Sequence, residues 1–208
     1  MFMEATSNNF GRLENQDYHL KEELKFNNDC EVSDTGLSTN KLEYRTSVEN
    51  QEVVKVGAST NTSISAFDVA KYILLKLEEP CTTMKLHKLL YYCQAWYLVW
   101  EDKPLFKEDI EAWANGPVIR QLFSFHHGLY WINANILTIG NPSKLNKVQI
   151  EDINNVLEFY GSKTSEWLIN QTHSESPWLK ARKGLMSNER GNSKITLQSI
   201  FDYYSNLK

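Results

Sequence analysis

The stretch MKLHKLLYYCQAWYLVW, residues 84–100, decides what kind of fold this chain can adopt. Its apolar side chains recur at helical spacing, at Leu86, Leu89, Leu90, Cys93, Tyr97 and Trp100. This spacing predicts an α-helix with one apolar face. The other side carries polar and aromatic residues: Lys85, His87, Lys88, Tyr91 and Gln94. We therefore expect a central helix whose second face is partly covered.

Helix boundaries are marked on both sides of this stretch. Thr83 is the expected N-cap of the central helix. Upstream, Ser65-Ala66-Phe67-Asp68 fits a capping box, and Pro80 predicts the end of that first helix. Downstream, Gly116-Pro117 predicts another helix start, with proline at the first helical position, and this helix should end near Gly128.

The C-terminal part carries further helix signals. We expect helices over about 150–160, with Gly161 as the stop, and over about 165–172. Ser176-Pro177 is typical of an N-cap and first turn, and a last helix should begin at Thr196. Residues 105–113 alternate in part and predict one or two short strands. The expected fold is mainly α, a single compact domain of six or seven helices with a minor strand component.

Aromatic residues and charge divide the chain near residue 62. Twenty of the 25 aromatic residues and all six tryptophans lie in 63–208, which we expect to form the domain. Residues 1–62 carry 11 acidic and 6 basic residues, a net charge of −5, and lack a regular apolar pattern. Such a composition predicts an acidic extension that is largely disordered or loosely docked.

Composition also argues against several classes of protein. Residues 63–208 have a net charge of +1 and no basic stripe, so DNA or RNA binding is not expected. Cys30, Cys81 and Cys93 form no CxxC pair, and the histidines make no HxxxH motif, so neither a disulfide framework nor a metal site is expected. No signal peptide or membrane span is visible, which favours a cytoplasmic protein. Phosphate-loop and dinucleotide-binding signatures are absent, so no cofactor is expected.

Three short motifs stand out from ordinary helix and loop sequence. They are KLHKLLYYCQAW at 85–96, PLF at 104–106 with EAWANGPV at 111–118, and THSESPW at 172–178. In this order they resemble the SocA-like antitoxin family, also called the Panacea domain, which includes phage-associated proteins of the GepA type. The resemblance covers roughly residues 65–208, and the long acidic extension is a departure from the family pattern.

The resemblance implies a non-catalytic protein that neutralises a toxin encoded nearby by binding it, with possible delivery to a Clp-type protease. An alternative is an adaptor from a phage or mobile element, without a dedicated toxin. The motif positions, whether structural or partner-binding, are His87, Lys88, Tyr91, Gln94, Trp96, Trp113, Asn115, Gly116, Pro117, Thr172, His173, Glu175, Pro177 and Trp178.

Each of these positions also has an ordinary structural interpretation. His87 fits a half-buried, hydrogen-bonded histidine, Gln94 an amide facing a loop, and Trp96 a core indole. His173, with Glu175 and neighbouring hydroxyls, supplies the ingredients of a hydrolase. However, adjacent residues at a helix end rarely point at one another, and no GxSxG turn is present.

Aromatic side chains are the remaining hint of function, because tyrosine and tryptophan are enriched at protein interfaces. The candidates for exposed positions are Tyr91, Tyr92, Trp100, Tyr130, Trp131, Trp167, Trp178, Tyr203 and Tyr204. The sequence leaves open which of them belong to the core.

Overall fold

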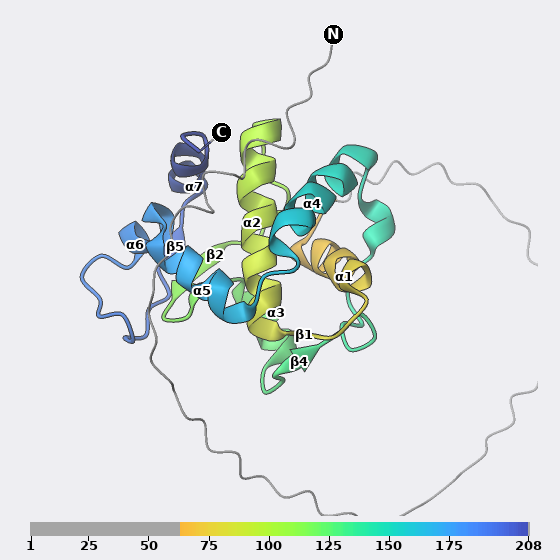
Figure 1. Cartoon of the computed structure of the whole chain (residues 1–208), viewed down its shortest axis with the longest axis horizontal. Helices are drawn as coiled ribbons and strands as arrows, with labels where there is room; N and C mark the ends of the chain where they lie inside the picture. Colours follow the sequence, from red (N-terminus) through yellow and green to blue (C-terminus); the bar gives the residue numbers. More distant parts are fainter. Residues whose placement is uncertain (1–62, 208) are drawn as a thin grey trace, which may run out of the picture. The chain divides into compact units, whose positions relative to one another are not determined.

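Helix α2 (Thr83–Glu101) runs through the middle of residues 63–207, the part of the chain that the computed structural model describes (Figure 1). Both of its faces are buried. Lys88 and Tyr91 on the polar side are 0% exposed, as are Leu86 and Leu89 on the apolar side. The central position of the helix is confirmed, and its second face is more completely covered than the sequence predicted.

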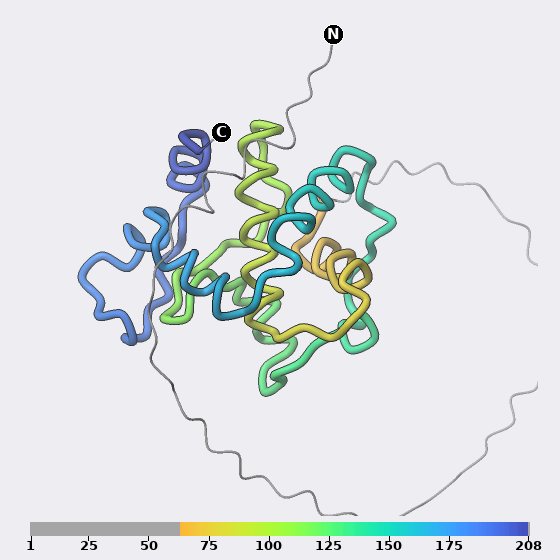
Figure 2. Tube along the Cα trace, in the orientation of Figure 1, coloured from red at the N-terminus to blue at the C-terminus, as the bar shows by residue number. Residues whose placement is uncertain are grey.

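Six further α-helices surround α2 in this part of the chain, so the mainly helical fold with six or seven helices is confirmed. In Figures 1 and 2, α1 and α4 lie on one side of α2, and α5, α6 and α7 lie on the other. The bounds are α1 (Ala66–Leu77), α3 (Arg120–His126), α4 (Lys147–Tyr160), α5 (Ser165–Ser174), α6 (Ser176–Ala181) and α7 (Leu197–Tyr204), with a 3-10 turn at Pro142–Lys144.

The strands are short and antiparallel. One sheet has the order β3-β2-β5, with Ala112 opposite Pro117 and Ile110 opposite Ile195. A second pair joins β1 to β4 and places Thr82 opposite Trp131. The bounds are β1 (Cys81–Thr82), β2 (Ile110–Trp113), β3 (Gly116–Val118), β4 (Trp131–Ile132) and β5 (Lys194–Ile195).

The prediction that Pro117 begins a helix was wrong. Pro117 lies in strand β3, and helix α3 begins three residues later, at Arg120. Strand β3 is an edge strand, where the missing N–H of proline costs no ladder hydrogen bond. Both positions accept the fixed φ of proline, so the dipeptide alone could not distinguish them.

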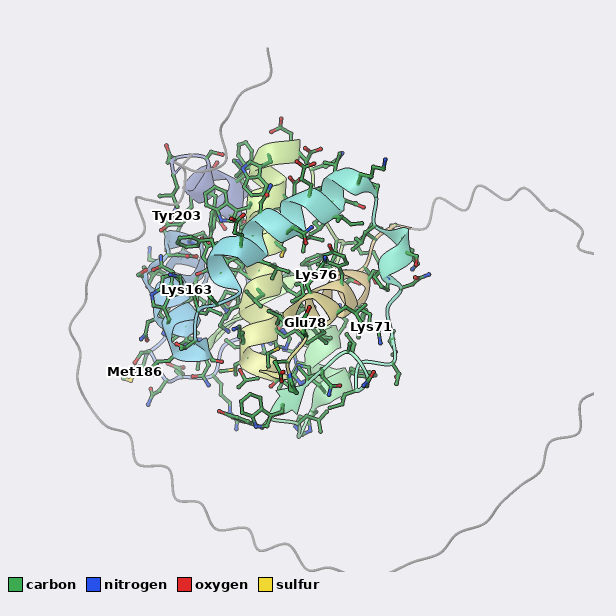
Figure 3. The ribbon with its side chains drawn as sticks, turned by 45° about the vertical axis from the view of Figure 1, so that its right-hand side comes forward. Lys71, Lys76, Glu78, Lys163, Met186 and Tyr203 are labelled. Atoms are coloured by element: carbon green, nitrogen blue, oxygen red, sulfur yellow. The ribbon has the colours of Figure 1, made fainter. Side chains whose placement is uncertain are left out.

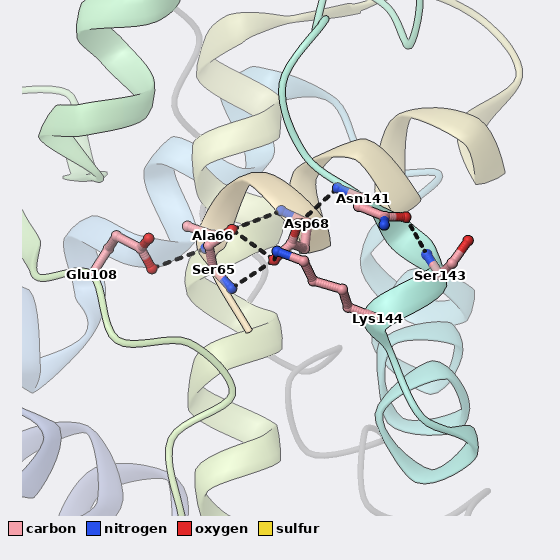
Figure 4. Close-up of polar contacts among 7 residues, drawn as sticks. All are labelled: Ser65, Ala66, Asp68, Glu108, Asn141, Ser143 and Lys144. Atoms are coloured by element: carbon pink, nitrogen blue, oxygen red, sulfur yellow. Dashed lines mark hydrogen bonds and ion pairs between the residues drawn. The ribbon is translucent and has the colours of Figure 1, made fainter. Parts of the chain in front are cut away.

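Asp68 connects the start of α1 to a distant loop (Figure 4). The predicted capping box is present: Ser65 Oγ accepts from the N–H of Asp68, and Asp68 Oδ2 accepts from the N–H of Ser65. The same carboxylate accepts from the N–H of Asn141 at 2.7 Å and from Lys144 Nζ at 3.3 Å. Although desolvation by burial raises the pKa of Asp68, these hydrogen bonds outweigh it and the net pKa is lowered.

Two predicted caps are displaced by one residue. The N-cap of α2 is Thr82, whose hydroxyl accepts from the N–H of Lys85, and Thr83 is the first helical residue. Ser176 is likewise the first residue of α6, and Glu175 occupies the cap position. The predicted caps at Thr196 and Gly161 are confirmed. None of the helices in residues 63–207 is long and apolar enough to span a bilayer.

The structure separates core aromatics from surface aromatics. Tyr91, Tyr92 and Tyr204 are fully buried, and the rings of Tyr92 and Tyr160 stack with centroids 3.9 Å apart. Trp178 is also buried, whereas Trp100, Trp167 and Tyr203 are partly buried. Figure 3 shows side chains that lie at the surface, among them Tyr203 and the strongly exposed Met186. The acidic extension predicted for residues 1–62 lies outside the described residues.

Candidate protein-binding site

The three sequence motifs meet around α2, beginning with Gln94. Its side-chain oxygen accepts from the N–H groups of Leu105 and Phe106 at 3.0 and 3.1 Å. Its amide nitrogen donates to the carbonyl oxygen of Phe106 at 3.1 Å. The expected contact between this amide and a neighbouring loop is confirmed. One buried glutamine thereby fixes the PLF segment against the central helix.

Lys88 joins α2 to the hairpin of β2 and β3. Its Nζ donates to the carbonyl oxygen of Pro117 at 3.1 Å, in a fully buried position. Burial lowers the pKa of Lys88 to about 7, so a substantial share of the molecules carries a neutral amine at neutral pH. Gly116 lies beside this amine with a φ of +97°. A Cβ there would stand 2.5 Å from Lys88 Cε and 2.9 Å from Thr172 Oγ1.

The third motif is held by Trp178 and Glu175. The indole N–H of Trp178 donates to the carbonyl oxygen of Trp113 at 3.0 Å, which connects α6 to β2. Glu175 accepts hydrogen bonds from the hydroxyls of Tyr92 at 3.0 Å and Tyr204 at 2.8 Å. Burial raises the pKa of Glu175 to about 7, although these hydrogen bonds act in the opposite direction.

His173 gives no support to the hydrolase hypothesis. Its ring stacks on Trp178 with centroids 4.2 Å apart, and burial together with the charges of Lys88 and Arg182 lowers its pKa to about 4. The neighbouring hydroxyls of Thr172 and Ser174 both donate to helix carbonyl groups, at 2.9 and 2.7 Å. Since no nucleophile and base face each other here, these residues do not form a catalytic set.

Most of the predicted site residues are therefore internal. Only Trp113, Asn115 and His173 are not buried. His87, Lys88, Gln94, Trp96 and Glu175 make contacts within the core, and Trp96 donates its indole N–H to the hydroxyl of Tyr160 at 3.2 Å. The remaining buried motif positions are Tyr91, Gly116, Pro117, Thr172, Pro177 and Trp178. Any surface that this domain offers to a partner must consist largely of other residues.

His87 contacts a histidine that the sequence did not connect with it. Its Nε2 lies 2.8 Å from Nε2 of His126, and its Nδ1 accepts from the N–H of Ile119 at 3.2 Å. Because Nδ1 accepts, the proton of the neutral ring lies on Nε2 and is donated to His126. Burial lowers the pKa of both histidines, which keeps the pair neutral. Neither nitrogen of His87 is free to bind a metal ion, and residues 63–207 hold no group of three metal-ligating side chains.

The histidine pair forms one wall of a pocket of about 750 Å³ at the N-terminal end of α2. Figure 1 shows that α3, β1 and β4 gather at this end of the helix. Trp113, Asn115 and Phe123 also line the pocket. Its volume falls in the range of pockets that hold small ligands or several side chains. Two of the motif residues that are not buried, Trp113 and Asn115, thus line the same pocket.

A corner of exposed aromatic residues adjoins this pocket. Tyr130 is 67% exposed and Trp131 is 56% exposed, and their rings contact edge to face at 5.3 Å. Leu129, which precedes them, lines the pocket. The carbonyl oxygens of Tyr130 and Leu129 accept from the N–H and the hydroxyl of Thr83, at 3.0 and 3.3 Å. We call Leu129, Tyr130 and Trp131 the aromatic corner. Its backbone is fixed while its side chains face solvent.

Part of the chain matches a known protein family. Residues 86–179 match the family model described as "Antitoxin SocA-like, Panacea domain". This part of the chain, slightly less than half of its length, is therefore similar to the SocA-like Panacea domain. The match includes all three motifs apart from Lys85, and with them the residues that make the buried contacts, Lys88, Gln94 and Glu175. No curated protein and no solved structure matches the chain.

Several residues that complete the pocket carry no signal in the sequence. His126 was not paired with His87, because 39 residues separate them and only the packing of α3 brings them together. Arg190 and Asn192 reach the pocket on a loop with no secondary-structure signal. Tyr130 and Trp131 were among the candidates for exposed aromatics, but nothing in their spacing distinguished them from core residues.

Proposed function

We propose that this protein is an antitoxin-like binding module that neutralises a toxin protein by direct contact. The observation that carries the proposal is the exposed aromatic corner on a Panacea domain, beside an open pocket. The family is named for antitoxins, and a protein partner is what its name implies. We further propose that the partner is encoded nearby and that the complex forms in the cytoplasm.

The aromatic corner has the properties of an interface anchor. Tyrosine and tryptophan dominate the energetics of many protein interfaces because they bury a large area while ordering few torsion angles. Tyr130 and Trp131 leave much of their surface in water. Burying this apolar surface against a partner would be favourable, because it removes the surface from water. The fixed backbone at Thr83 reduces the entropy that binding must offset.

The domain that does this extends beyond the family match. Helices α1 and α7 lie outside residues 86–179, yet both pack against α2, and buried Ile73 and Tyr204 belong to the same core. We therefore propose 63–208 as the limits of the domain. The buried motif residues then serve to hold the corner and the pocket in place, and the exposed residues contact the partner.

An adaptor role is the second candidate. Residues 1–62 have a net charge of −5, unlike the nearly neutral domain, and such a segment could engage a second protein such as a Clp-type protease. In this case the partner would be degraded more slowly when residues 1–62 are deleted. Unchanged turnover of the partner after the deletion would exclude that role for the extension.

The proposal is tested by co-expressing the full chain with the product of each neighbouring gene. Growth rescue from a toxic neighbour, together with a complex that co-purifies, is the expected result. His173→Ala serves as the matched control for hidden enzymology, because binding alone should not need that imidazole. Absence of both rescue and co-purification for every neighbour would contradict the antitoxin role.

A further inference from the structure

We propose that the pocket beside the aromatic corner binds an acidic segment of the partner protein, with Arg190 as the group that contacts its carboxylate. This inference rests on the proposed function and adds to it the chemistry of the segment that is recognised. It depends on the charge of the residues that line the pocket, on the loop that carries Arg190, and on the apolar side chains of the pocket.

The pocket contains no acidic side chain among its lining residues, although the whole chain has more acidic than basic residues. Two arginines line it, Arg120 and Arg190. Arg120 is already engaged, since its Nε and NH2 groups donate to the carboxylate of Glu111 at 2.8 and 2.7 Å. Arg190 makes no ion pair with any residue in 63–207. It is thus the lining cation that remains available to an anion.

A buried arginine fixes the loop that presents Arg190. Arg182, which is 4% exposed, donates to the carbonyl oxygens of Met186, Ser187 and Glu189 at 2.8, 3.3 and 2.7 Å. It also donates to Ala112 of strand β2 at 3.2 Å. These bonds hold the segment just before Arg190 against the sheet. The backbone that leads to Arg190, which lines the pocket, is therefore held in an ordered turn.

The N-terminal end of α2 adds a favourable field for an anion. Thr83 and Met84, in the first turn of this 19-residue helix, line the pocket, and no acidic residue occupies that turn. The partial positive charge of a helix N-terminus stabilises a nearby carboxylate. This term supports the contact with Arg190 and could not replace it.

Apolar side chains also line the pocket. The rings of Trp113 and Phe123 meet edge to face with centroids 4.7 Å apart, and Leu129 of the aromatic corner also lines the pocket. A segment with acidic residues next to an apolar or aromatic residue matches both Arg190 and the apolar side chains that line the pocket. A nucleic acid fits less well, because phosphate binding usually relies on several cations, and residues 63–208 have a net charge of only +1.

The test measures the binding of defined probes to the full chain by fluorescence anisotropy. The main probe is a labelled, capped peptide in which glutamate alternates with phenylalanine, and its counterpart has glutamine in place of glutamate. Arg190→Gln should weaken binding of the glutamate peptide by about tenfold or more, because a charged hydrogen bond is lost. Arg190→Lys should retain most of it. Lys183→Gln, in the same exposed loop but outside the pocket, should change it by less than about twofold.

Several results would overturn the inference. Equal binding of the glutamate and glutamine peptides would do so, and so would no binding of either peptide. Equal affinity of the wild type and Arg190→Gln for the glutamate peptide would also contradict it. So would stronger competition by inorganic phosphate or an oligouridylate than by the unlabelled glutamate peptide. Co-expression separates this inference from the proposed function. If a partner co-purifies equally with the wild type and with Arg190→Gln, the pocket assignment fails and the binding function stands. If no partner is found, the function fails, and the peptide titration decides the pocket by itself.

Discussion

The side-chain nitrogen Nζ of Lys88 lies 3.1 Å from the carbonyl oxygen of Pro117, inside the core of the domain. This contact joins the central helix to the hairpin that carries Trp113 and Asn115 into the pocket. It is possible because Gly116 leaves room for the lysine stem where any other residue would place a Cβ. The position of the proposed binding surface therefore depends on a contact that is itself inaccessible to a partner.

Replacing Gly116 tests how tightly this contact is packed. In Gly116→Ala the new Cβ would meet Lys88 Cε at 2.5 Å, in a backbone conformation with φ of +97°. The sum of overpacking and left-handed strain should lower the free energy of unfolding by about 2–4 kcal/mol. Chemical denaturation measures it. The matched control is Gly128→Ala, at φ of +87° with open space around the Cβ, which should cost about 1–2 kcal/mol. Equal losses would contradict the close packing.

The buried amine of Lys88 predicts a pH dependence of stability. Its pKa is about 7 in the folded state, against 10.5 for a free lysine. Between these values the unfolded state binds more protons, so the free energy of unfolding rises with pH, by up to about 1.4 kcal/mol per pH unit. Lys88→Met lacks this titration. The stability of the wild type relative to Lys88→Met should therefore increase from about pH 7 towards pH 10.5, and a constant difference would refute a lysine that is neutral when folded.

Glu175 predicts the opposite slope at lower pH. Its pKa is raised from 4.5 to about 7, so the folded state binds more protons between these values. As the pH rises through this range, the free energy of unfolding of the wild type should fall relative to that of Glu175→Gln, by up to about 1.4 kcal/mol per pH unit. His87 and His173 titrate in both proteins, so their contributions cancel in the difference. Denaturation curves at several pH values measure it, and parallel stabilities would show that Glu175 is ionised in the core.

The aromatic corner should contribute little to folding. Tyr130→Ser with Trp131→Ser removes side chains that are mostly in solvent, while the backbone bonds to Thr83 remain. The free energy of unfolding should change by no more than about 0.5 kcal/mol per site. Thermal unfolding checks this. A large loss would show that these rings stabilise the domain itself and would weaken their assignment as an interface.

Much of the fold could be predicted because its signals are local. The apolar spacing in 84–100 identified the central helix, and the capping box at Ser65 marked the start of α1 correctly. The contact between the side chain of Gln94 and a neighbouring loop could be predicted because an amide in a buried helix requires a hydrogen-bond partner. Where two structures satisfy the same local requirement, as for Pro117, the local signal is ambiguous and the prediction was wrong.

The candidate site was harder to predict because it is assembled from distant segments. His87 and His126, or Arg182 and the carbonyl groups it holds, become neighbours only after α3 and the loop at 182–191 have packed. Exposure poses the same difficulty: Tyr91 and Tyr130 look alike in sequence, yet one is 0% and the other 67% exposed. Only the covering elements decide which aromatic residue can meet a partner.

The most direct test of the central claim compares two full-length proteins in the same co-expression. The wild type and the variant Tyr130→Ser with Trp131→Ser are each produced with the neighbouring gene product, and the amount that co-purifies is measured. The account predicts a stable complex and growth rescue with the wild type, and at least about tenfold weaker binding with the folded variant. Equal capture of the partner by both proteins would contradict the claim that the aromatic corner is the binding surface.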